Sequence, residues 1–288
     1  MYKKPKVIAE IGCNHKGDMS IAFDLLDLAK QAGADVAKFQ KRNSRELLSK
    51  KQYNSPHPNP YNSYGDTYGE HREFLEFDLE QNIKLMSYCN KIDIQYSTSV
   101  WDVTSAKEIV SINPNMIKVP SACNLHFDML ETLRDQYDGE VHISLGMTTP
   151  VEIEKIINFF DVKNILKDRI IIYACTSGYP VPFDQLCLLE IKKLIEKYGS
   201  RVKSVGFSGH HLGIAADIAA YTLGANWIER HFTKDRTWKG TDHAASLEPS
   251  GLSKLIRDLD ITHKSLAYKK SNIMDIEEPQ REKLKWKK

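Results

Sequence analysis

Short runs of β-branched and apolar residues alternate along this chain with longer stretches in which apolar residues recur at helical spacing. The short runs have the length of buried strands, and the longer stretches are typical of amphipathic helices. The expected strands are 6–12, 35–40, 94–100, 116–121, 141–146, 169–175, 204–208 and 227–232. The expected helices are 19–32, 72–90, 102–112, 127–134, 150–160, 184–198, 214–223 and 249–267. Each strand is therefore followed by a helix.

Eight such units predict an α/β protein, either a closed (β/α)8 barrel or a large open sheet. Nucleotide-binding open sheets carry a GxGxxG or GxxxxGK[ST] turn after a strand, and this sequence has neither. We therefore expect a (β/α)8 TIM barrel over residues 1–270, followed by a charged, exposed tail at 271–288. The irregular segment 41–71 would lie at the catalytic face of that barrel, as a functional loop or a passive insertion.

Composition narrows the class of protein further. Lys and Arg number 40 against 38 Asp and Glu, so a net charge of +2 gives no electrostatic case for nucleic acid or a membrane surface. We find no apolar run long enough to span a membrane and no secretory signal, so no membrane partner is expected. Five cysteines without a CxxC pair argue against a disulfide framework or a zinc cluster and favour a reducing cytoplasm.

Charged residues interrupt three of the expected strands. Glu10 lies within the first strand, Lys38 within the second and Lys118 within the fourth. Parallel barrel strands are normally apolar throughout, and two buried lysines that face one pocket repel each other. The lysines indicate either a structural ion pair with Glu10 or, taken together, a site that binds an anion.

Hydroxyl residues recur where the expected strands end, which is the catalytic edge of a barrel. A hydroxyl can donate a hydrogen bond to a phosphate oxygen without adding charge. The residues in question are Ser97, Thr98, Ser144, Thr176, Ser177 and Ser208.

Two histidines close the last two strands. His210 follows the seventh strand and His231 lies in the eighth, so a barrel would bring them close together. Two imidazoles with open positions suit a catalytic divalent ion. His211 is the alternative to His210, and Glu229, two residues before His231, is a candidate to support that histidine.

Four segments resemble the sialic acid (N-acetylneuraminate) synthase family, and together they span almost the whole chain. They are IAEIGCNHKG at 8–17, AGADVAKFQ at 32–40, YACTSGYP at 173–180, and 206–248 with IERHFTKD and TDHAASLEP. The resemblance implies a barrel that condenses phosphoenolpyruvate with an N-acylated aldose to give a 2-keto-3-deoxy acid and phosphate.

The same resemblance implies roles for residues. Those expected to bind phosphoenolpyruvate are Lys38, Thr98, Lys118, Ser121, Ser144, Ser177 and Ser208. His210 and His231 would bind Mn²⁺, with Mg²⁺ or Co²⁺ as alternatives, and Glu10, Tyr179 and Asp242 would face the sugar or its intermediate. The family also implies a homodimer or homotetramer.

Departures from the family pattern cluster where the sugar should bind. We expect no C-terminal antifreeze-like domain, Ser121 is followed by Ala-Cys where relatives have Gly-Glu, and Ser208 by Gly-His-His where they have Asp-His-Thr. Ser177 also replaces the Asn of many relatives. We therefore expect the same reaction on a different aldose, with substitute contacts from Tyr64, Tyr68, His71 and Arg72.

Two alternatives stay open. One is a synthase that uses a phosphorylated aldose, as octulosonate-phosphate and heptulosonate-phosphate synthases do, and an extra cationic cluster at the sugar end would favour it. The other is a barrel that binds a sugar acid without catalysis.

Overall fold

Eight parallel strands close into a barrel in the computed structural model, which describes residues 2–286. Each strand pairs with its neighbours in sequence, and the first pairs with the last. The strands are β1 (Lys6–Gly12), β2 (Val36–Lys41), β3 (Gln95–Val100), β4 (Met116–Val119), β5 (Glu140–Ser144), β6 (Ile170–Cys175), β7 (Ser204–Gly209) and β8 (Trp227–His231). The (β/α)8 barrel expected from the sequence is confirmed.

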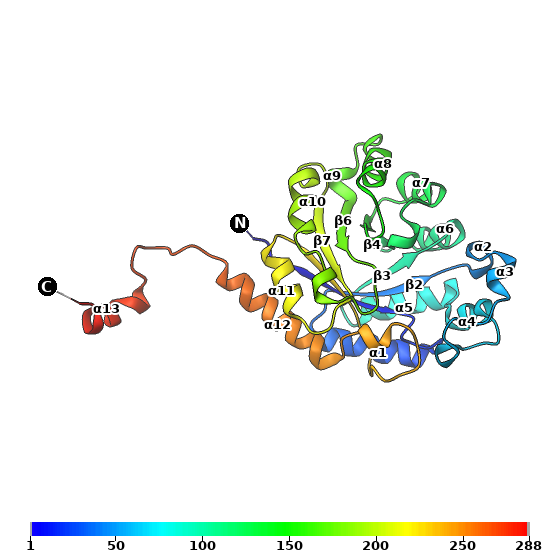
Figure 1. Ribbon diagram of the computed structural model, residues 1–288, viewed down its shortest axis with the longest axis horizontal. Helices are drawn as coiled ribbons and strands as arrows, with labels where there is room; N and C mark the ends of the chain where they lie inside the picture. Colours follow the sequence, from blue (N-terminus) through cyan, green and yellow to red (C-terminus); the bar gives the residue numbers. More distant parts are fainter. Residues whose placement is uncertain (1, 287–288) are drawn as a thin grey trace.

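Helices surround this barrel on its outside (Figure 1). One main helix follows each strand, as the alternating pattern predicts. These helices are α1 (Met19–Ala32), α5 (Leu79–Lys91), α6 (Val103–Ile112), α7 (Phe127–Asp135), α8 (Pro150–Asp161), α10 (Glu190–Tyr198), α11 (Ala215–Thr222) and α12 (Pro249–Ser265). Five short 3₁₀ turns lie among the described residues: η1 (Pro60–Asn62), η2 (Ser121–Cys123), η3 (Phe183–Gln185), η4 (His243–Ala245) and η5 (Asp275–Glu277).

The single helix expected at 72–90 is wrong, because the structure has two helices there. α4 spans Tyr68–Leu75, and α5 begins after Asp78. Asp78 Oδ1 accepts a hydrogen bond from the Gln81 backbone N–H at 2.8 Å, and the Asp78 backbone N–H donates one to Gln81 Oε1 at 2.9 Å. This capping box starts a new helix within what reads as one periodic stretch.

The segment expected to be irregular, 41–71, is partly helical. It contains α2 (Ser44–Leu47), α3 (Lys50–Tyr53) and η1 before α4 begins. The helix expected at 184–198 begins only at Glu190, after the 3₁₀ turn η3. The last short α-helices are α9 (Leu166–Arg169) and α13 (Glu278–Leu284).

Two apolar layers hold the barrel together. The larger layer fills the space between strands and helices. The smaller lies inside the barrel near its amino-terminal end and consists of Ile8, Val36, Met116, Ile171, Tyr173 and Trp227. Because side chains alternate along a strand, the next inward positions lie above this layer, and they are polar. The polar side chains inside the barrel therefore gather toward the carboxyl ends of the strands.

The chain leaves the barrel after α12. Figure 1 shows the following residues running outward, with α13 standing apart from the barrel. Most side chains between 266 and 286 are exposed. Among residues 2–286, no helix has both the length and the apolar character that a membrane crossing requires.

Candidate active site

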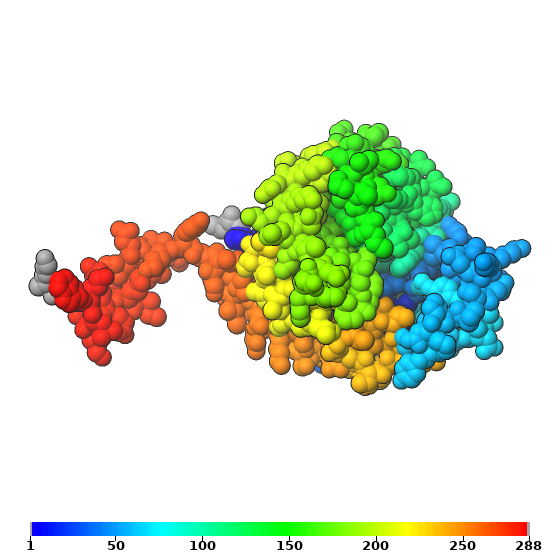
Figure 2. Space-filling view, in the orientation of Figure 1, coloured from blue at the N-terminus to red at the C-terminus, as the bar shows by residue number. Residues whose placement is uncertain are grey.

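A cavity of about 450 Å³ opens at the carboxyl ends of the strands, where barrel enzymes place their chemistry. Figure 2 shows the surface hollowed between the cyan segment that contains α4 and the green and yellow segments that follow the later strands. Eleven of the twelve site residues expected from the sequence line this cavity: Glu10, Lys38, Lys118, Ser121, Ser144, Ser177, Tyr179, Ser208, His210, His231 and Asp242.

Two buried lysines form the inner floor of the cavity together with two glutamates. Lys118 Nζ donates to both oxygens of Glu229, at 2.8 and 2.9 Å, and Lys38 forms an ion pair with Glu10. Lys38 Nζ also lies 3.7 Å from Glu229. All four side chains are at most 8% exposed, so their charges are compensated mainly by one another. An anionic ligand would compete with the glutamates for these ammonium groups.

The pKa values of this quartet reflect burial and mutual attraction. Burial alone would raise the pKa of Glu229, but the ammonium groups of Lys118 and Lys38 outweigh it and hold that pKa well below its usual range. Burial lowers the pKa of Lys118, although the nearby carboxylate of Glu229 acts to raise it. Burial raises the pKa of Glu10, and the charges of Lys38 and His231 oppose that rise. Glu229 is therefore the fixed anion of the site, and Glu10 is the carboxyl group closer to exchanging a proton.

The structure gives Glu229 a different partner from the one expected. The sequence suggested that it supports His231, but its carboxylate is occupied by Lys118 and by the hydroxyl of Ser208, which donates at 3.0 Å. Glu229 and His231 both point into the barrel, yet the lysine from the opposite side reaches Glu229. The expectation of support for the histidine is wrong.

Three serine side chains line the cavity between β4 and β6. Gly146 lies among them, and its N–H donates to Ser121 Oγ at 3.0 Å. A Cβ atom at Gly146 would stand 2.5 Å from Ser177 Oγ and 2.8 Å from Ser121 Oγ. The absence of a side chain at this position therefore leaves both hydroxyls free to face the cavity, alongside Ser144.

Thr98 does not reach the cavity, which corrects the remaining site expectation. Lys38 pairs in register with Ser97, and Ser99 pairs with Lys118, so Ser97 and Ser99 share the inward face of β3. Thr98 lies between them and faces the helices, fully buried. Ser99 takes its place: it lines the cavity and accepts a hydrogen bond from Lys38 Nζ at 2.8 Å.

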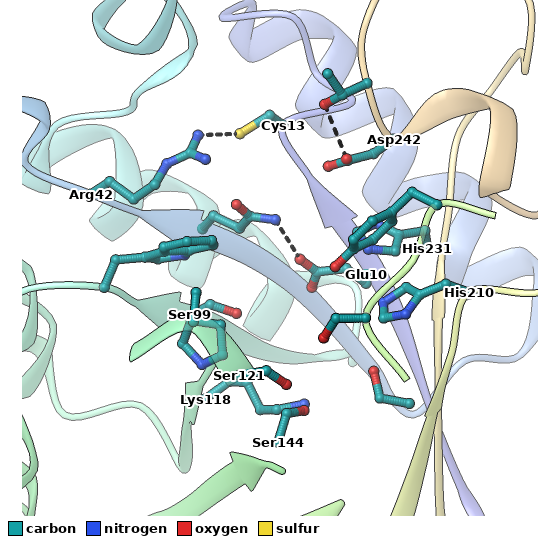
Figure 3. A pocket seen from close by; sticks show the side chains of 18 of the residues that line it. Glu10, Cys13, Arg42, Ser99, Lys118, Ser121, Ser144, His210, His231 and Asp242 are labelled. Carbon is teal, nitrogen blue, oxygen red and sulfur yellow. Dashed lines mark hydrogen bonds between the residues drawn. The ribbon is translucent and has the colours of Figure 1, made fainter. Parts of the chain in front are cut away.

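The two expected histidines lie side by side at the cavity wall. The rings of His210 and His231, both labelled in Figure 3, are 5.4 Å apart between centroids. The ring of Tyr179 packs 4.3 Å from that of His210. Burial, followed by the charge of His231, lowers the pKa of His210 to about 3, so its imidazole is neutral at pH 7. His211, the alternative, is fully buried outside the barrel against Arg230 and Asp217.

The nitrogen atoms of this pair fit a metal ion. His210 Nδ1 lies 3.2 Å from the Thr176 carbonyl, which can only accept, so Nδ1 carries the proton and Nε2 keeps its lone pair. Nδ1 of His231 is buried and has no hydrogen-bond partner among residues 2–286. Within that range no group of three or more His, Cys, Asp or Glu side chains is arranged to hold a metal. A metal here would take two protein ligands.

Helix α4 and the segment before it form the outer wall. Tyr68, His71 and Arg72, expected as sugar contacts, line the cavity. Tyr64 is outside the lining, and its hydroxyl donates to the Lys239 carbonyl at 2.6 Å. Among the lining residues that sequence reasoning missed at this end and nearby are Cys13, Gln40, Arg42, His57 and Trp101.

The sequence carried a signal for some of these missed residues. Gln40 is two positions after Lys38 on the same strand, and Trp101 is two positions after Ser99, so period-two alternation places both toward the cavity. Gln40 Nε2 donates to Glu10 Oε1 at 3.1 Å. Burial raises the pKa of the Cys13 thiol to about 12, so this group is protonated at pH 7. No sequence pattern predicts His57.

Comparisons with known proteins find relatives over most of the chain. The NeuB family model matches residues 25–271. The chain is 35% identical to N-acetylneuraminate-9-phosphate synthase of Mus musculus, covering 96% of this chain and 76% of that protein. It is 30% identical to N,N'-diacetyllegionaminic acid synthase of Campylobacter jejuni, covering 92% and 78%. The crystal structure of N-acetylneuraminic acid synthetase from Leptospira borgpetersenii, in complex with citrate, superposes with a TM-score of 0.81 at 28% identity, covering 99% of this chain and 94% of that one.

Proposed function

Because this chain belongs to the NeuB family, we propose that it condenses phosphoenolpyruvate with the aldehyde of an open-chain sugar. The product is a 2-keto-3-deoxy sugar acid of the nonulosonate type, and phosphate is released. The relatives named above make different sugar acids, so the acceptor is an N-acylated hexosamine or a related aldose.

The observation that carries this proposal is the pair of buried lysines beside a group of serine hydroxyls. Phosphoenolpyruvate has a carboxylate and a phosphate group, and Lys38 and Lys118 supply positive charge for both at the cavity floor. Ser121, Ser144 and Ser177 offer hydroxyl donors on the same side without further charge. Such a site holds a small dianionic or trianionic ligand at a fixed place and orientation.

Carbon–carbon bond formation comes first in the proposed reaction. The enol carbon C3 of phosphoenolpyruvate attacks the aldehyde carbon, and the aldehyde oxygen takes up a proton from water. C2 then carries positive charge, which the glutamates of the floor stabilise while the lysines hold the phosphate and carboxylate.

Water next adds to C2 and loses a proton. Glu10 is our candidate for the base that accepts it at a carboxylate oxygen, since it lines the cavity and its raised pKa brings it closer to the working pH. The tetrahedral intermediate then collapses: the bond between C2 and the phosphate oxygen breaks, the phosphate leaves with the proton of the C2 hydroxyl, and the ketone forms. Tyr179 and Asp242, which also line the cavity, are proposed to contact the sugar.

We further propose that His210 and His231 hold a divalent ion, with Mn²⁺ first among candidates. When bound, such an ion supplies Lewis-acid polarisation of the aldehyde oxygen. His231→Ala should weaken Mn²⁺ binding at least tenfold, as measured by electron paramagnetic resonance of free Mn²⁺, and should remove metal-dependent turnover. His263→Ala, on the far helix α12, is the control. Equal Mn²⁺ affinity in both variants would refute the assignment.

The direct test of the reaction is phosphate release from phosphoenolpyruvate with Mn²⁺ across a panel of aldoses. Phosphoenolpyruvate labelled with ¹⁸O at its bridging oxygen should deliver the label to phosphate, because the C–O bond breaks. Release in the absence of an aldose, or label retained in the sugar acid, would contradict the mechanism. If no aldose led to phosphate release, the enzymatic proposal would be wrong, and the alternative of a barrel that binds a sugar acid without catalysis would remain.

A further inference from the structure

Three hydrogen-bonded side chains, Glu140, His142 and Tyr173, form a line inside the barrel and take no part in the proposed reaction. Tyr173 Oη lies 2.7 Å from His142 Nδ1, and His142 Nε2 lies 3.1 Å from Glu140 Oε2. Tyr173 and His142 are fully buried, whereas the side chain of Glu140, the first residue of β5, is 25% exposed and also pairs with Lys203 at 2.9 Å. The line therefore starts at the amino-terminal end of the barrel, opposite the catalytic cavity.

The direction of each hydrogen bond in this line follows from the state of Glu140. Burial alone would raise the pKa of Glu140, but hydrogen bonds from His142 and Lys203 outweigh it and lower that pKa to about 2. The carboxylate can only accept, so the proton of the His142 ring lies on Nε2. Burial lowers the pKa of His142 to about 4, which keeps this ring neutral at pH 7. His142 Nδ1 therefore accepts, and Tyr173 Oη donates.

The line ends at the aromatic ring of Tyr173, whose face lies against Lys118. Lys118 Nζ is 4.0 Å from the ring centroid, which is within cation–π distance. Gly206 leaves room for the ring, since a Cβ atom there would stand 2.5 Å from Tyr173 Cε1. The ammonium group of Lys118 thus has two kinds of partner, the carboxylate of Glu229 and this ring.

The two partners of Lys118 act differently on an arriving anion. Glu229 attracts the ammonium group, but it also repels the charges of phosphoenolpyruvate and competes with them for the same N–H groups. The ring attracts the ammonium group without a net charge, so it keeps its hold when an anion binds. Donation from the Tyr173 hydroxyl to His142 makes the ring more electron-rich and strengthens this attraction.

We propose that Tyr173 is a positioning residue for Lys118: its ring holds the ammonium group at the cavity floor, and the line through His142 to Glu140 holds the ring. The inference rests on the proposed function, in which Lys118 binds phosphoenolpyruvate, and extends it to a residue at the opposite end of the barrel. Tyr173 does not line the cavity, so it acts through Lys118 and not on the substrate.

Other ionisable groups face Lys118 as well. They are Glu229 on β8, Lys38 on β2, Cys175 on β6 and His142 on β5. Burial raises the pKa of the Cys175 thiol, which is therefore protonated at pH 7, and His142 is neutral. Glu229 is the anion of this set, and the Tyr173 ring adds a second attraction that favours the charged form of Lys118.

Calorimetric titration of the full chain with phosphoenolpyruvate tests the contact without turnover. Tyr173→Leu removes the ring and should weaken binding about tenfold to thirtyfold at pH 7.5. Tyr173→Phe keeps the ring, loses the hydrogen bond to His142 and should weaken binding about threefold. If Tyr173→Leu binds phosphoenolpyruvate as tightly as the unaltered protein does, the proposal is overturned.

The pH dependence of binding separates this contact from a general loss of packing. Phosphoenolpyruvate should bind less tightly as Lys118 loses its proton at alkaline pH, and Lys118→Arg identifies that loss, because an arginine stays charged. In Tyr173→Leu the loss should begin about one pH unit lower, since the ring favours the protonated lysine. Weaker binding by the same factor at every pH would show a packing role and overturn the proposal.

Glu140→Gln tests the line from its far end, outside the cavity. It should weaken phosphoenolpyruvate binding about twofold to threefold and move the alkaline loss in the same direction as Tyr173→Leu does. Lys203→Met is the matched control, because it breaks the same ion pair and leaves the Glu140 carboxylate to His142. Equal effects of the two substitutions would overturn the role of the line.

The positioning role and the proposed reaction fail separately. If Tyr173→Leu weakens phosphoenolpyruvate binding and no aldose releases phosphate, the positioning role stands and the reaction falls. If phosphate is released and Tyr173→Leu binds phosphoenolpyruvate like the unaltered protein, the reaction stands and the positioning role falls.

Discussion

Glu229→Gln tests the charge balance of the cavity floor, because this carboxylate lies 2.8 Å from Lys118 Nζ and 3.7 Å from Lys38 Nζ. At an effective dielectric constant of about 20, those separations correspond to attractions of about 6 and about 4.5 kcal/mol. The loss of unfolding free energy in the variant is smaller than the sum of these attractions, because a lysine without its partner can give up its proton. Deprotonating an ordinary lysine at pH 7 costs about 4.6 kcal/mol, which sets an upper limit for each residue.

We therefore expect Glu229→Gln to lower the free energy of unfolding at pH 7 by about 3–5 kcal/mol, as for other buried ion pairs that lose one partner. Without the carboxylate, the pKa of Lys118 in the folded state falls further below its unfolded value. The destabilisation is then fully present below the folded pKa and disappears as the pH approaches the unfolded pKa of about 10.4. Raising the pH from 7 to 9 should recover roughly 2 kcal/mol.

Urea denaturation at the two pH values measures both effects. Glu190→Gln is the control, because Glu190 pairs with Lys193 at 3.1 Å on the exposed face of α10 and should cost under about 1 kcal/mol. Phosphoenolpyruvate should stabilise Glu229→Gln more than the unaltered protein, since it supplies the missing negative charge. If Glu229→Gln lowers the free energy of unfolding by less than about 1 kcal/mol at pH 7, or by the same amount at pH 7 and pH 9, this account of the cavity floor is refuted.

Two further predictions concern residues placed by the barrel geometry. Ser99→Ala removes the hydroxyl that accepts from Lys38 and should lower kcat/KM for phosphoenolpyruvate about fivefold or more, whereas Thr98→Val, on the opposite face of β3, should leave it within twofold. If Thr98→Val lowered kcat/KM more than Ser99→Ala did, the register of β3 would be wrong. Gly146→Ala puts a methyl group against the Ser121 and Ser177 hydroxyls and should raise KM for phosphoenolpyruvate about tenfold with little loss of folded protein by circular dichroism. An unchanged KM would remove these serines from the binding site.

The alternation of strands and helices was predictable because it depends on local periodicity. The eight strands and their main helices follow from runs of apolar residues, and the charged residues inside strands, such as Glu10 and Lys118, were visible as interruptions of those runs. Barrel geometry then places inward strand-end residues around one opening. That is why most of the candidate site could be listed from the sequence.

The face that each polar residue of β3 takes could be predicted only from its apolar neighbours, not from the polar residues themselves. Both faces of a barrel strand are buried, so the sequence QYSTSV offers polar side chains to either one. The stronger signal was the spacing of Ile94, Tyr96 and Val100, which marks the helix-facing side and places Thr98 on it. The residues on the other side, including Ser99, then face the cavity.

The sequence by itself determined the barrel, the chemical types at its catalytic edge and the family to which they belong. Only the tertiary structure decided which charges meet. Lys118 and Glu229 are 111 positions apart and pair across the barrel interior, and Arg42 pairs with Glu76, 34 positions further along the chain. Local propensity acts between neighbours in the chain, whereas ion pairing inside a closed barrel depends on strand register and on how the loop at 41–77 folds over its end.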